Sequence, residues 1–169
     1  MPITDNHIYF FICYATSFLV MALIGKWYLY PAVKKLPLKV ALTPLLLYAC
    51  LRVNGLTFLM PGVVREDLPQ EFALPTAYGD LTAVALALLA LWALRNDSTL
   101  ARPLLWLFNI VGLLDLIYAQ IATFIYDVDP ASLGASYYLV VLNVPAMVVV
   151  HIIMIMLLLR PEATETASS

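Results

Sequence analysis

The sequence predicts an all-α integral membrane protein with five transmembrane helices in one bundle. Three observations support this fold class. Hydrophobic residues make up 63% of the chain and charged residues 12%, which leaves too few polar side chains to cover a water-facing surface. Five segments are apolar and nearly long enough to cross a bilayer, which takes roughly 20 helical residues. The loops between these segments alternate between basic and mainly acidic.

The predicted spans form a single domain over residues 1–160. The fifth span, YYLVVLNVPAMVVVHIIMIMLLL, has no formal charge when its histidine is neutral. The second is interrupted by LRVNG, so it either continues to residue 60 or stops at Leu51 and is followed by a re-entrant piece; we favour the full span. Residues 161–169 are expected to form a disordered cytoplasmic tail. The five spans cover residues 8–30, 40–60, 78–94, 104–126 and 137–159.

Loop charge predicts the orientation of the bundle, because cytoplasmic loops carry an excess of Lys and Arg. The first loop has several lysines and no acid, and the third has two arginines, whereas the second and fourth loops are mainly acidic. We therefore expect the N-terminus outside and the C-terminus in the cytoplasm. The formal net charge of −2, without a basic block, excludes a nucleic-acid partner.

Polar side chains at membrane depth are the candidate functional residues, because charges there are costly and usually face protein or water. At 1.5 Å of rise per residue, Arg52, Asp80 and Asp115 share one layer roughly 16–21 Å above the cytoplasmic edge. Two asparagines are expected just above this layer and a histidine below it. The candidate ligand or proton site is Arg52, Asn54, Asp80, Asp115, Asn143 and His151.

Helical periodicity predicts which faces of the spans meet. Asn109, Gly112 and Asp115 fall on one face of the fourth span, together with small residues. In the third span, Asp80 lies on a stripe with Ala83 and Ala87, which would let another backbone approach closely. Supporting roles are assigned to Asn109, Gly112 and Tyr48.

The expected interaction in this layer is an ion pair of Arg52 with Asp115, with Asp80, or with both. One arginine between two carboxylates leaves a charge of about −1, and an uncompensated buried charge tends to take up a proton. The cluster is therefore a candidate proton acceptor. The alternative is a static ion pair that locks the second, third and fourth helices together.

No cofactor is expected. His151 has Met147 and Met154 on its face, as a haem or copper ligand would, but no second histidine is expected at its depth. Cys13 and Cys50 lack CxxC spacing, so neither a zinc site nor a redox pair is indicated. The sequence also lacks a nucleophile elbow, an HExxH motif, a P-loop and a dinucleotide fingerprint, and so favours no enzymatic reaction.

Three functional hypotheses follow from these residues. The leading one is binding or movement of a small solute or of protons through an outward-facing pocket. The second is a structural or accessory subunit of a membrane complex, in which the polar cluster only fixes helix packing. The third is a membrane enzyme acting on a lipid or quinone, with a lateral opening and a head group near Arg52. The expected partners are the lipid bilayer and either a second copy or another membrane protein.

Three short segments resemble small multi-pass bacterial proteins to which no activity is assigned. They are NIVGLLDLIYA at residues 109–119, NVPAMVVVHI at residues 143–152 and YGDL at residues 78–81. The resemblance implies a location in the bacterial inner membrane. It also directs attention to Asp80, Asn109, Asp115 and His151.

Overall fold

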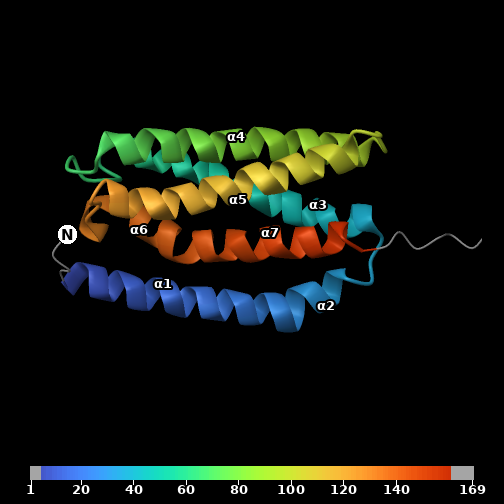
Figure 1. The fold of residues 1–169 in the computed structure, drawn as a ribbon, viewed down its shortest axis with the longest axis horizontal. Helices are drawn as coiled ribbons and strands as arrows, with labels where there is room; N and C mark the ends of the chain where they lie inside the picture. Colours follow the sequence, from blue (N-terminus) through green and yellow to red (C-terminus); the bar gives the residue numbers. More distant parts are fainter. Residues whose placement is uncertain (1–4, 161–169) are drawn as a thin grey trace, which may run out of the picture.

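The computed structural model describes residues 5–160, which form helices joined by short turns. Five of these helices are long and apolar enough to cross a membrane, and they run side by side along one axis (Figure 1). The predicted all-helical class and the five long apolar helices are thereby confirmed. The predicted tail, residues 161–169, lies outside the described residues. The long helices cover Asp5–Val33, Leu38–Leu59, Gln70–Arg95, Ala101–Ile125 and Ser136–Leu158.

The first long helix lies at the edge of the bundle. It consists of α1 (Asp5–Ile24), the π-helical η1 (Gly25–Leu29) and α2 (Tyr30–Val33). Pro31 has no N–H to bond to the carbonyl one turn earlier, and the preceding turn widens, with the Tyr30 N–H donating to the Gly25 carbonyl. The helix packs mainly on the fifth one, and little of it is buried.

The second long helix changes type halfway along. It begins as α3 (Leu38–Ala49) and continues without a break as the 3₁₀-helix η2 (Cys50–Leu59), so the helix does not stop at Leu51 and has the length that the favoured full span requires. Side chains three residues apart eclipse one another in a 3₁₀-helix. The buried residues of η2 follow this period: Arg52, Gly55 and Phe58. The change of helix type therefore aligns Arg52 with Gly55 and Phe58 on the inner face.

The third and fourth long helices, α4 (Gln70–Arg95) and α5 (Ala101–Ile125), pack closely along their length. α4 begins at Gln70 rather than at the expected residue 78, directly after Pro69. Ala83, Ala87 and Ala90 are completely buried. The small side chains that the sequence places on this stripe therefore face the interior, as predicted for Ala83 and Ala87.

The fifth long helix runs through the middle of the bundle in Figure 1. After the short 3₁₀-helix η3 (Pro130–Leu133), it comprises α6 (Ser136–Tyr138), the π-helical η4 (Leu139–Asn143) and α7 (Val144–Leu158). Pro145 cannot bond to the carbonyl of Val141, and the widened turn lies directly before it. In contrast, α3 continues through Pro44 as a regular helix.

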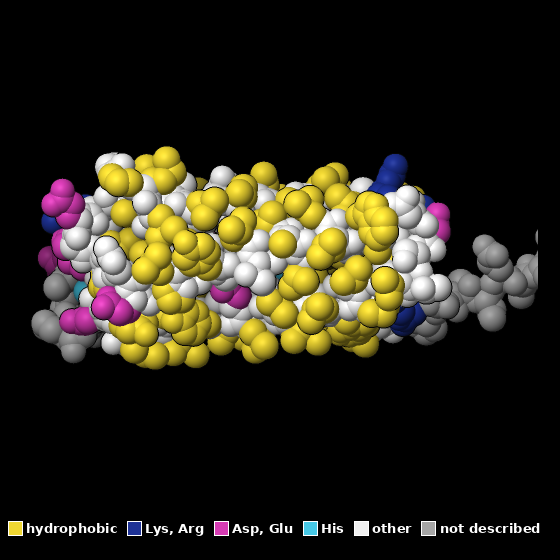
Figure 2. Space-filling view, turned by 90° about the horizontal axis from the view of Figure 1, so that it is seen from above, with side chains coloured by type: hydrophobic (Ala, Val, Ile, Leu, Met, Phe, Trp, Pro, Cys, Tyr) yellow, Lys and Arg dark blue, Asp and Glu magenta, His cyan; other side chains and the backbone are white. Residues whose placement is uncertain are grey.

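The apolar interior is divided into two parts along the bundle. One cluster, toward the end with the predicted basic loops, contains Leu46, Phe108 and Met154. The other, toward the acidic end, contains Phe58 and Phe72. Most charged side chains lie at the two ends, the acidic ones mainly at one end. The surface between the ends is mainly apolar, although acidic atoms are also visible at mid-length (Figure 2). The candidate site lies between the two apolar clusters, at mid-length of the bundle.

The complete burial of Ala87 gives a test of the packing. Ala87→Leu should lower the free energy of unfolding by about 1–3 kcal/mol, because added methyl groups have no space between α4 and its neighbours. Leu88→Val is the matched control, since Leu88 is 51% exposed on the same helix and should change stability little. Denaturant unfolding of the purified protein in detergent measures both, and equal stability of the two variants would contradict this packing.

Candidate functional site

The guanidinium of Arg52 is the centre of the candidate site. Its Nε donates to Asp80 Oδ1 at 2.7 Å, and its Nη2 forms an ion pair with Asp115 Oδ2. Its Nη1 donates to the carbonyl of Gly112 at 3.0 Å. Of the two pairings expected from the sequence, both are present.

These contacts join η2 to three other long helices. Asp80 comes from α4, Asp115 and Gly112 from α5, and His151, which also reaches Nη1, from α7. The Arg52 side chain is 1% exposed, and the two carboxylates are 13% and 12% exposed. A single charged group therefore connects four of the five long helices within the apolar interior.

Three glycines make room for the side chains of this cluster. A Cβ added to Gly79 would lie 2.6 Å from Asp115 Cγ, and one added to Gly55 would lie 2.7 Å from Asp80 Cγ. A Cβ on Gly112 would lie 2.8 Å from His151 Nε2 and 3.1 Å from Arg52 Nη1. Separations under 3.0 Å do not occur for real Cβ atoms, so each functional side chain needs a glycine on the facing helix.

Hydrogen bonds fix the protonation of His151. The Nδ2 of Asn109 donates to the Leu105 carbonyl at 2.8 Å, so the Oδ1 of Asn109 is its acceptor toward His151 Nδ1, 3.0 Å away. His151 therefore carries its hydrogen on Nδ1, and its Nε2 lone pair faces Arg52 Nη1 at 3.5 Å. Both ring nitrogens are engaged by protein groups. A metal or haem iron would have to displace one of these contacts.

Asn143 lies at the edge of the cluster and is held from the second helix. Its Oδ1 accepts a hydrogen bond from the Tyr48 hydroxyl at 3.1 Å. Asn143 is the last residue of the π-helical turn before Pro145, so the widened turn positions its side chain. Tyr48 thus has the supporting position expected of it.

Asn54 was expected at the mouth of the site, and this prediction is wrong. The residue is exposed on the outer side of η2 and does not line the cavity described below. The expectation used only depth along the helix. At three residues per turn, Asn54 is about 240° around the axis from Arg52. It therefore lies at the depth of the site but on the face of the second helix that points away from the bundle interior.

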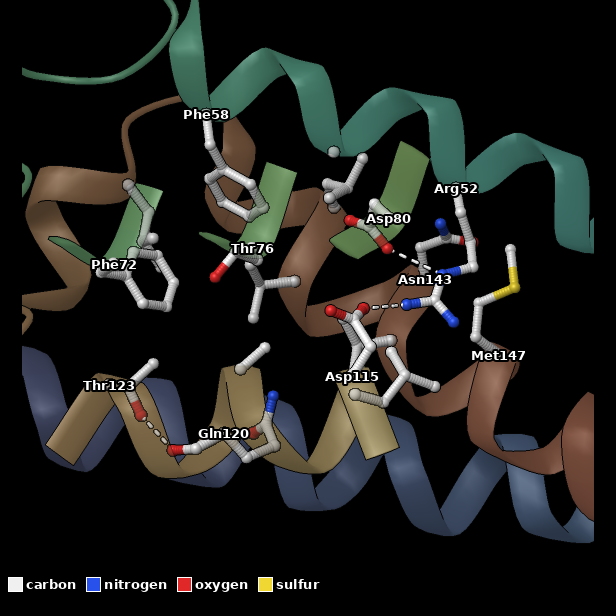
Figure 3. A pocket seen from close by; sticks show the side chains of 17 residues that line it. Arg52, Phe58, Phe72, Thr76, Asp80, Asp115, Gln120, Thr123, Asn143 and Met147 are labelled. Carbon is white, nitrogen blue, oxygen red and sulfur yellow. Dashed lines mark hydrogen bonds and ion pairs between the residues drawn. The ribbon is translucent and has the colours of Figure 1, made fainter. Parts of the chain in front are cut away.

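A small cavity of about 40 Å³ adjoins the ion cluster on the side of the acidic end. Arg52, Asp80, Asp115 and Asn143 line one part of it, as Figure 3 shows. The other part is mainly apolar, with the rings of Phe58 and Phe72 packed edge to face at 5.7 Å. Thr76, Gln120 and Thr123 add polar groups to this part of the lining.

A second hollow opens sideways between α1, α3 and α7. It is an apolar groove of about 290 Å³ that includes Gly25, Pro44 and Tyr48 in its lining. A lipid or quinone enzyme would need a lateral opening that brings a head group to Arg52. Arg52 does not line this groove. The Tyr48–Asn143 hydrogen bond joins a residue of the groove lining to a residue of the cavity lining.

Sequence reasoning missed Gly55, Gly79 and Thr76. Their roles depend on contacts between helices rather than on their own chemistry. A glycine within an apolar helix is a signal for close approach, and this signal is present at Gly79, next to Asp80 in YGDL. It does not indicate which side chain fills the space.

The fold and the site define a class: a helical protein with five long apolar helices and one buried ion cluster at mid-length. The chain belongs to the family described as a domain of unknown function (DUF8737), whose family model matches residues 9–159. No curated protein matches the chain, and no solved structure does.

The contact of Gly79 with Asp115 can be tested by a double-mutant cycle. Gly79→Ala should lower the free energy of unfolding by about 1–3 kcal/mol because the new methyl group displaces the carboxylate. In an Asp115→Ala background most of this loss should disappear, since the shortened side chain leaves the space empty. Asp80→Ala is the control, because Asp80 lies against Gly55 and the Gly79→Ala loss should persist there. The same loss in all three backgrounds would contradict the contact.

Proposed function

We propose that this is a bacterial inner-membrane protein that takes up a proton, or a ligand of similar size, at the cluster of Arg52, Asp80 and Asp115. In the proposed orientation the N-terminus is outside, the C-terminus is in the cytoplasm, and the acidic end of the bundle faces outward. The observation that supports the site most strongly is one buried guanidinium paired with two carboxylates beside a cavity. With ionised carboxylates its formal charge is −1. A bound cation or proton would neutralise it.

The size of the cavity favours a very small ligand. A cavity needs about 10–15 Å³ to hold one water molecule, so a cavity of about 40 Å³ holds only a few waters. Pockets for ordinary small molecules are about 300–1,000 Å³. We therefore narrow the hypothesis of a small solute to a ligand no larger than a few water molecules.

The surroundings of the cluster favour access from one side. Toward the acidic end it borders the cavity, whereas toward the basic end it borders Asn109, His151 and then the packed side chains around Phe108 and Met154. The ring of Phe108 stacks on that of His151 at 4.8 Å. We propose that uptake occurs from the acidic side and that His151 acts as the relay only when this packing opens.

Flux measurements on reconstituted vesicles test the proposal. A pH gradient should drive proton uptake through the wild-type protein, and Asp115→Asn should abolish it, because the amide keeps the size of the side chain but cannot exchange a proton. Asp97→Asn is the matched control, since Asp97 pairs with Lys39 at the surface, far from the cluster. Flux that is unchanged in Asp115→Asn would remove this carboxylate from the mechanism.

A second candidate, the accessory subunit, is supported by the first long helix. It packs along one side on the fifth helix, while large apolar side chains such as Leu19, Trp27 and Tyr28 remain at least 60% exposed. A partner protein or a second copy of this chain would cover this face. In this case the ion cluster only fixes helix packing.

Replacing the whole cluster separates the two candidates. The triple variant Arg52→Met, Asp80→Val and Asp115→Val removes all charge, and exchange of a buried ion pair for apolar residues of similar size is often neutral for stability. Proton uptake predicts a folded variant without flux. The accessory role predicts a folded variant that retains its membrane partner in a pull-down, and the loss of that partner would contradict it.

A further inference from the structure

We propose that the cavity beside Arg52 binds one monovalent metal cation of the sodium class. Its ligands are the carboxylate oxygens of Asp80 and Asp115 that Arg52 does not use and the hydroxyl of Thr76. The inference rests on the proposed function because it uses the same two carboxylates. It adds the identity of a ligand that these carboxylates hold.

The hydroxyl of Thr76 points to a ligand independently of the acidic cluster. The residue is 4% exposed, and within residues 5–160 its Oγ1 has no hydrogen-bond partner. Two other helical threonines bond to the carbonyl four residues earlier, at 2.7 Å for Thr43 and 2.8 Å for Thr82. A buried hydroxyl without a partner is costly, and Thr76 lines the cavity.

Each of the two carboxylates has one oxygen that Arg52 does not contact: Oδ2 of Asp80, which lies against Gly55, and Oδ1 of Asp115, which lies against Gly79. Arg52 contacts Oδ1 of Asp80 and Oδ2 of Asp115. In Figure 3 the second oxygen of each carboxylate lies on the side away from the guanidinium, toward Thr76. The amide of Gln120 also lines the cavity, and in Figure 3 its nitrogen is the atom nearer the carboxylates. The oxygen donors of the proposed site are therefore the free oxygens of the two carboxylates and the hydroxyl of Thr76.

Charge and ligand type select a monovalent, oxygen-binding cation. The cluster with one arginine and two ionised aspartates has a formal charge of −1, so a monovalent cation neutralises it and a divalent one leaves +1. Calcium takes 6–8 oxygens and magnesium requires a near-octahedral set, more than this mainly apolar cavity offers. Within the described residues no group of three or more His, Cys, Asp or Glu side chains is placed to hold a metal ion. The cavity of about 40 Å³ has space for a cation with one or two waters.

The charged groups around the site come from three helices. Arg52 faces it from η2, Asp80 from α4 and Asp115 from α5. His151 of α7 contacts the far side of the guanidinium and does not line the cavity. Within the cavity lining, one guanidinium therefore balances only one of the two ionised carboxylates.

Thermal unfolding of the full-length protein in detergent tests the inference. At constant ionic strength and constant pH, sodium chloride should raise the Tm relative to choline chloride. Thr76→Val should weaken the apparent affinity for sodium on the order of tenfold by removing one ligand. Thr76→Ser keeps the hydroxyl and should retain binding. Thr82→Val is the control on the same helix, since Thr82 is exposed and bonds to its own backbone.

The outcomes separate this inference from the proposed function. A Tm that does not depend on sodium or lithium overturns the cation site and leaves water as the occupant of the cavity. A sodium effect that Thr76→Val does not change also overturns it as located here. If sodium raises the Tm and vesicles show no proton flux, the cation site stands and the proposed proton uptake falls. If flux is present without any sodium effect, proton uptake stands and the cation site falls.

Discussion

The guanidinium of Arg52 is the interaction on which the rest of the structure depends. It is the charged group that joins the second, third, fourth and fifth long helices, and it lies between two apolar clusters that fill the two halves of the bundle. Removing one partner from a buried ion pair generally costs about 3–5 kcal/mol, because the other charge is left uncompensated. The two aspartates would be left in this state without the arginine. The polar layer therefore constrains how the four helices can be arranged.

Backbone geometry makes this layer sterically possible. The 3₁₀ period of η2 aligns Arg52 with Gly55, and Gly55 faces the carboxylate of Asp80. Gly79 and Gly112 provide space for Asp115 and for His151 in the same way. Glycine and 3₁₀ geometry are both unfavourable within a long helix. Their concentration at one level fits a general pattern in which local costs gather at functional sites.

Much of the fold could be predicted from composition and periodicity. Long apolar segments have few structural solutions, because every backbone polar group within them must be bonded internally. The expected layer of Arg52, Asp80 and Asp115 followed from a constant rise per residue, and it is present because these three residues lie near the middle of their helices. The ion pairs followed from charge alone, since each buried charge needs an opposite one.

What the sequence did not predict depends on local departures from the α-helix and on side-chain packing. Asn54 was misplaced because only its depth was considered; two residues from Arg52, it lies on a different face whether the helix is α or 3₁₀. The π-helical turns before Pro31 and Pro145 are local changes that periodicity averaged over a whole span does not reveal. The sequence did not identify Thr76 as a site residue, because the hydroxyl of a helical threonine normally bonds to the backbone of its own helix. Its unsatisfied hydroxyl is visible only once the cavity around it is known.

An ion cluster that only fixes helix packing and one that takes up protons would make the same contacts. Only the second would change its charge with pH. Infrared titration of the wild-type protein beside Asp80→Asn and Asp115→Asn measures this directly, through the carbonyl stretch of protonated carboxylic acids. Proton uptake predicts a carboxylic acid band that appears reversibly as the pH falls in the folded protein and that at least one of the two variants loses. Carboxylates that stay ionised throughout the pH range of the folded state would contradict the proposed function. Arg52 and its partners would then only fix the packing of the helices.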